Sequence, residues 1–130
     1  MKYQFSKVVE FVPEWNDNHK LEKAEQVSMS LNVLSMGDVL LLMDTLEQDP
    51  SQKKGNVESE NLDMSTTSAL VEHAIVLLPK YVENFANLEG PDGPISTEEI
   101  CKYPQFIGLI VEILFQLISI STPSEADTKN

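Results

Sequence analysis

The chain has 130 residues and a formal net charge of −12, which comes from 9 basic and 21 acidic side chains. A chain of this length can bury roughly two-thirds of the surface that its unfolded form exposes, so it needs no disulfide or metal to fold. All nine basic residues are Lys. Because duplex binding depends on clustered positive charge and on the two-pronged Arg side chain, nucleic acid is disfavoured as a partner, and so is an anionic membrane surface.

Cysteine and histidine are rare in this sequence. The single cysteine, Cys101, cannot form an intramolecular disulfide, and one Cys with two His cannot build a structural zinc site. This usage fits a reducing cytoplasm. The first twelve residues alternate between polar and apolar side chains, so no secretory signal is expected.

Two segments near the N-terminus alternate with a period of two. Residues 3–11 do so with one interruption at Lys7, and residues 26–33 do so cleanly, with Val27, Met29, Leu31 and Val33 on one face. Between them, residues 13–20 hold a Pro and an Asn/Asp cluster, which favour turns. The pattern predicts a β-hairpin with a long loop.

The first helix is predicted to start at Ser35, which is placed as an N-cap with Asp38 three residues later. It should run to about Glu47, because Asp49-Pro50 follows. Residues 49–63 carry almost nothing to bury, which predicts a mobile loop.

A longer helix is predicted over residues 65–88, where apolar side chains recur at spacings of three and four. Pro79 should kink or break it near Leu77 and Leu78, since proline removes a helical hydrogen bond. Residues 90–94, Gly-Pro-Asp-Gly-Pro, form a turn. Ser96 and Glu99 have the spacing of a capping box, so a short helix should start there.

The last predicted helix, over residues 104–120, is apolar except for one narrow stripe formed by Gln105, Gly108, Glu112, Gln116 and Ser119. Its apolar run is about five residues too short to span a membrane and has a charge at its middle, so it is interpreted as a core helix. The fold class is therefore α+β, a hairpin followed by about four helices, with a mainly α fold as the alternative. Residues 1–120 should form a single domain, and residues 121–130 a disordered tail.

The candidates for chemistry are weak. His73 beside Glu72 could act as a general base, but no nucleophile stands in a recognisable motif. Cys101 is better explained as a partly buried small side chain. Asn16-Asp17-Asn18 resembles a fragment of a calcium loop but lacks the required Gly and Glu. There is no phosphate-binding loop or dinucleotide motif, so we expect no enzyme activity, cofactor or metal.

The apolar surface of the two longest helices is large for a domain of this size, which predicts a protein partner or self-association. The residues expected to bind a partner are Trp15, on the polar loop, and Leu109, Leu114 and Phe115, on the last helix. An exposed aromatic side chain is a frequent anchor at interfaces. Trp15 could equally cap the core of the hairpin.

Four stretches of the sequence, in order, carry a resemblance to a known family. They are residues 9–18 (VEFVPEWNDN), residues 34–38 (LSMGD), residues 77–82 (LLPKYV) and residues 121–125 (STPSE). In their order and spacing the chain resembles the small tail assembly chaperones of long-tailed bacteriophages. The resemblance implies a non-enzymatic protein of the infected bacterial cytoplasm. Such a protein binds the long helical tape measure protein and assists assembly of the tail tube protein around it.

A hypothesis from another class is an acidic mimic of nucleic acid that inhibits a DNA-binding protein through its charge. Against it, the acidic residues are spread along the chain without a phosphate-like spacing. A neighbouring gene for a very long helical protein would favour the chaperone, and a restriction or repair locus would favour the mimic.

Overall fold

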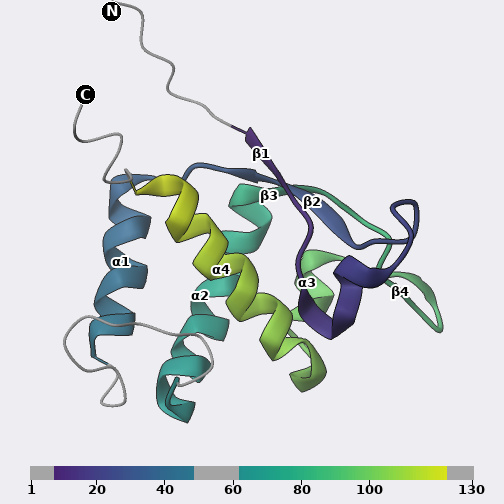
Figure 1. Cartoon of the computed structure of the whole chain (residues 1–130). Coiled ribbons are helices and arrows are strands. Elements are labelled where there is room, and N and C mark those ends of the chain that lie inside the picture. Colours follow the sequence, from purple (N-terminus) through teal and green to yellow (C-terminus); the bar gives the residue numbers. More distant parts are fainter. Residues whose placement is uncertain (1–7, 49–61, 123–130) are drawn as a thin grey trace, which may run out of the picture.

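A computed structural model describes residues 8–48 and 62–122. The protein combines a three-stranded antiparallel sheet with helices and a small second hairpin, so the predicted α+β class is confirmed. Figure 1 shows the sheet along one side of the molecule, with the three long helices packed next to one another below it.

The sheet has the order β1-β2-β3. Strands β1 (Val8–Phe11) and β2 (Ser28–Asn32) form the predicted hairpin, with Val9 opposite Leu31 and Glu10 opposite Ser30. The loop between them contains a short 3-10 segment, η1 (Trp15–Lys20). The predicted polar face of β2 is partly enclosed, because Ser30 donates a hydrogen bond to Glu10 and accepts one from Asn84 of the third strand. Residues 1–7, at the start of the predicted first strand, lie outside the described part.

The predicted helix over residues 65–88 is wrong in its last part. Helix α2 (Met64–Tyr81) continues through Leu77, Leu78 and Pro79 and ends at Tyr81. The chain then forms strand β3 (Val82–Ala86), which pairs with β2 through Leu31 and Val82. Proline weakens the end of the helix, and the free edge of β2 supplies the hydrogen bonds that the next residues need.

The two helix starts predicted from capping residues are confirmed. Ser35 caps α1 (Met36–Glu47) by accepting from the backbone N–H of Asp38. Ser96 and Glu99 form a full capping box on α3 (Thr97–Ile100). Between α2 and α3, the predicted turn closes a two-stranded hairpin of β4 (Glu89–Gly90) and β5 (Gly93–Pro94). Gly93 has a φ of 116°, which only glycine adopts readily.

The core lies between the sheet and the helices, and α4 (Ile107–Ser121) contributes most to it, as predicted for a core helix. A 3-10 turn, η3 (Pro104–Phe106), leads into α4. The predicted tail boundary is wrong by two residues: Ser121 ends α4 and accepts a hydrogen bond from the backbone N–H of Leu34, and Thr122 caps the helix. Residues 49–61 of the predicted 49–63 loop and residues 123–130 of the tail fall outside the described residues, and Asp63 is the N-cap of α2.

Candidate functional site

The polar stripe of α4 holds the loop between β1 and β2. The Glu112 carboxylate accepts hydrogen bonds from the backbone N–H groups of Glu14 (2.6 Å) and Trp15 (3.0 Å). The Trp15 ring lies over Gly108, where an added Cβ would meet ring atom Cδ1 at 3.3 Å, and its centroid is 5.6 Å from that of Phe106. A charge and a glycine within an apolar helix thus form a seat for this loop.

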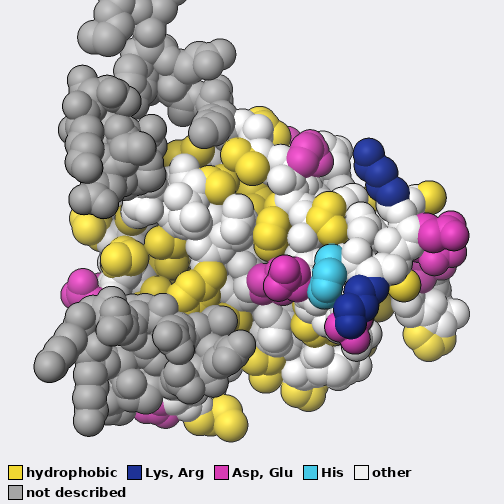
Figure 2. Space-filling model, viewed as in Figure 1, with side chains coloured by type: hydrophobic (Ala, Val, Ile, Leu, Met, Phe, Trp, Pro, Cys, Tyr) yellow, Lys and Arg dark blue, Asp and Glu magenta, His cyan; other side chains and the backbone are white. Residues whose placement is uncertain are grey.

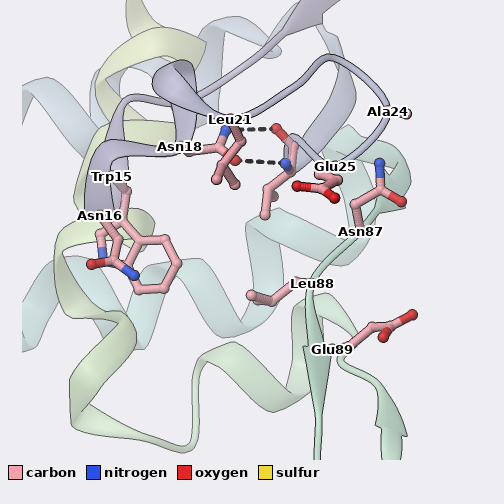
Figure 3. Close-up of a pocket in the computed structure, with 10 residues that line it drawn as sticks. Trp15, Asn16, Asn18, Leu21, Ala24, Glu25, Asn87, Leu88 and Glu89 are labelled. Carbon is pink, nitrogen blue, oxygen red and sulfur yellow. Dashed lines mark hydrogen bonds between the residues drawn. The ribbon is translucent and has the colours of Figure 1, made fainter.

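Beside this seat is a pocket of about 490 Å³, which we call the Trp15 pocket. Its apolar walls come from Trp15, Leu21, Val27 and Leu88. Figure 3 shows Trp15 and Asn16 on one side of it and Asn87 and Glu89 on the other, with Leu88 between the two sides. The remaining lining residues are Asn18, Ala24 and Glu25. This pocket is open to solvent and is lined by apolar side chains together with polar and acidic ones.

A second concave region, which we call the α2 groove, runs along α2 where it faces α3 and η3. Its two adjoining hollows, of about 300 and 190 Å³, share Cys101 and Lys102. The apolar lining includes Met64, Val71, Ile75, Tyr103 and Ile107. Met64 is 77% exposed and Ile75 56% exposed, so the groove presents apolar side chains to solvent.

Helix α1 also exposes apolar side chains. Met36 and Leu40 stand four residues apart and therefore share one face of the helix, with Met43 three residues further along. Figure 2 shows hydrophobic side chains gathered over α1 and the adjoining part of α4, whereas most charged side chains visible on that face lie toward the β1–β2 loop.

The structure separates the four side chains predicted to bind a partner. Leu109 and Leu114 are fully buried in the core, so neither can touch a partner while this fold is kept. Trp15 and Phe115 are partly buried against the core. Trp15 packs on Gly108 and Phe106 and also lines a pocket, and its role in binding a partner stays a prediction.

Residues 104–121, which comprise η3 and α4, are long and apolar enough to cross a membrane by length and composition alone. Six α4 side chains are buried in the protein core, including Ile110, Val111, Ile113 and Leu117. The carboxylate of Glu112, within this segment, binds the backbone of the β1–β2 loop.

The structure also shows the surroundings of the other residues that were considered for catalysis or metal binding. Nε2 of His73 is 3.1 Å from the hydroxyl of Thr45, which joins α2 to α1. Cys101 is partly buried, as expected, and burial raises the pKa of its thiol, which disfavours the reactive thiolate. Asn16 and Asp17 adopt left-handed backbone conformations, while Asn18 is buried. Within residues 8–48 and 62–122, no group of three or more His, Cys, Asp or Glu is placed to hold a metal ion.

A polar cluster fixes the N-terminus of α1 to the end of α2. The Tyr81 hydroxyl donates to the Asp38 carboxylate (2.5 Å) and accepts from the backbone N–H of Ser35 (3.1 Å). Lys80 lies 3.1 Å from the same carboxylate. The hydrogen bond from Tyr81 is the main cause that lowers the pKa of Asp38, and the hydrogen bond to Asp38 raises the pKa of Lys80.

Comparison with known protein families, with curated proteins and with solved structures finds no match for this chain.

Proposed function

We propose that this protein is a non-enzymatic tail assembly chaperone of a long-tailed bacteriophage. It binds helical segments of the tape measure protein in the cytoplasm of the infected bacterium while the tail tube protein assembles around them. The resemblance in sequence suggests this role, and the α2 groove is the observation that supports it.

The length of the α2 groove suits about three turns of one amphipathic helix. From Met64 to Ile75, α2 rises by about 16 Å, which equals roughly three turns of a helix lying alongside. Such a partner would place its apolar side chains at positions i, i+3 or i+4, and i+7 into the groove. The exposed methionine suits a client with many related segments, because its flexible side chain adapts to different shapes.

The charge of the protein fits the same role. A protein that exposes Met36, Leu40, Met64 and Ile75 risks self-aggregation, and a net charge of −12 opposes it by mutual repulsion. The lining of the α2 groove combines apolar side chains with the charged side chains of Glu72, Glu98 and Lys102. Protein interfaces generally combine apolar and charged groups in this way.

The test compares two neighbouring residues of α2. Ile75 lines the α2 groove, whereas Val76 is 67% exposed and does not line it. The tape measure protein encoded in the same genome is co-expressed with the wild type, with Ile75→Glu or with Val76→Glu. Wild type and Val76→Glu should keep the tape measure protein soluble and co-purify with it, and Ile75→Glu should bind it about tenfold more weakly or worse.

Equal binding by Ile75→Glu and Val76→Glu, with the same melting temperature for both, would contradict the assignment to the groove. If the wild type itself neither solubilises nor binds the tape measure protein, the chaperone function is refuted. An acidic mimic of nucleic acid would instead bind a DNA-binding protein, with a strong dependence on salt and none on Ile75.

A further inference from the structure

We propose that the Trp15 pocket binds an arginine side chain of a partner protein. The pocket shares no lining residue with the α2 groove, so this inference does not depend on the proposed function.

The walls of the Trp15 pocket match the two parts of an arginine side chain. The aliphatic stem would pack on Leu88, Leu21 and Val27, and the guanidinium group would lie against the Trp15 indole, the best aromatic partner for a cation. An arginine side chain also fits the volume of about 490 Å³ and leaves room for the neighbouring peptide backbone.

The charge of the Trp15 pocket favours the same occupant. Glu25 and Glu89 both line it, and both are exposed. Neither carboxylate forms an ion pair or a hydrogen bond with any side chain in residues 8–48 and 62–122. In Figure 3 the Glu25 carboxylate lies on the Asn87 side of the pocket, across from Trp15. A guanidinium group that stacks on Trp15 would find acceptors for its remaining N–H groups there, and planar donors suit carboxylates.

The Trp15 pocket is held in shape before any ligand arrives. The Asn18 side chain accepts from the backbone N–H of Val27 (2.7 Å) and donates to the carbonyls of Val27 and Pro13 (both 2.9 Å). Two of these bonds are drawn in Figure 3. Across the pocket, the Asn87 side chain donates to the carbonyl of Gln26 (2.9 Å). A preformed pocket loses little conformational entropy on binding, which favours even a small ligand.

The only tryptophan of the chain lines this pocket, so its fluorescence reports binding directly. The probe is the blocked tripeptide acetyl-Gly-Arg-Gly-amide, and the control replaces arginine with citrulline, which has the same shape without the charge. The arginine peptide should change Trp15 emission saturably at millimolar concentration, at least fivefold more tightly than the citrulline peptide. Salt at 0.5 M should weaken binding of the arginine peptide.

Variants locate the site. Glu25→Gln and Glu89→Gln should each weaken binding of the arginine peptide by roughly twofold to fivefold. Glu98→Gln removes an equal charge from the lining of the α2 groove. It should leave binding of the arginine peptide unchanged. Ile75→Glu should also leave it unchanged, which separates this inference from the proposed function. Equal binding of both peptides, an equal effect of all three Gln variants, or no saturable change up to roughly 20 mM would overturn the proposal.

Discussion

The hydrogen bonds of Glu112 allow a quantitative prediction about what holds the β1–β2 loop. Replacing Glu112 with Ala removes a charged acceptor from two backbone N–H groups. The bond to Trp15 is partly buried and should contribute about 1.5 to 3 kcal/mol, because hydrogen bonds to charged groups are the stronger ones. The bond to Glu14 is exposed, and water can replace it, so it should contribute at most about 1 kcal/mol.

Alanine favours a helix by about 0.4 kcal/mol over glutamate, which offsets part of the loss. Glu112→Ala should therefore lower the free energy of unfolding by about 1 to 3.5 kcal/mol. Glu112→Gln keeps one neutral acceptor and should lose about 1 kcal/mol. Urea unfolding followed by circular dichroism measures the stability, and Trp15 emission measures whether the loop leaves α4.

Gln116→Ala is the matched control, since Gln116 lies one turn further along the same stripe and accepts no bond from the loop among the described residues. If the free energy of unfolding of Glu112→Ala lies within about 0.5 kcal/mol of that of Gln116→Ala, the two hydrogen bonds do not hold the loop. An unchanged emission spectrum in Glu112→Ala would contradict the seat described for Trp15 in the same way.

Two further predictions concern the helices. The pKa of Asp38 is lowered below its ordinary value of 3.8, chiefly by the Tyr81 hydroxyl, so its contribution to stability is present above that pH and is lost as pH falls through the folded-state pKa. Asp38→Asn should accordingly cost about 1 kcal/mol in urea unfolding at pH 7 and less at pH 3, and a difference independent of pH would contradict this. Leu114→Asp buries an unpaired charge at a fully buried position and should cost more than about 4 kcal/mol, so circular dichroism should show a largely unfolded chain. Gln105→Asp, at an exposed position, should keep the wild-type melting curve.

Local signals explain the parts of the fold that the sequence predicted correctly. Ser35 caps α1, and Ser96 with Glu99 caps α3. In both cases the interacting residues lie within four positions of one another, so the sequence alone is enough to predict the interaction. The alternation in residues 26–33 likewise follows from the geometry of a single strand. The same holds for α4, whose excess of apolar residues predicted its place in the core.

Strand β3 is the element that local sequence signals predicted wrongly. Val82, Phe85 and Leu88 recur at a spacing of three, which fits a helical face, but the chain pairs with β2 instead. Two signals against the helix were present: Pro79, and the asparagines at 84 and 87, which adopt left-handed conformations here. Neither signal indicates which strand β3 pairs with, because its partner β2 lies about 50 positions earlier in the chain.

The candidate sites depend still more on tertiary structure. The sequence alone singled out Trp15, as a partner anchor or a cap on the hairpin core, and Glu112, as a charge in an apolar helix. Their separation by 97 residues hid that Glu112 binds the backbone of Trp15. It also placed Leu109 and Leu114 among the partner-binding residues, since composition does not tell which side of an apolar helix its own protein covers. Sequence by itself thus determined the helix starts, the hairpin and the apolar helix. Packing decided which apolar side chains stay exposed, because burial is a property of the whole folded chain.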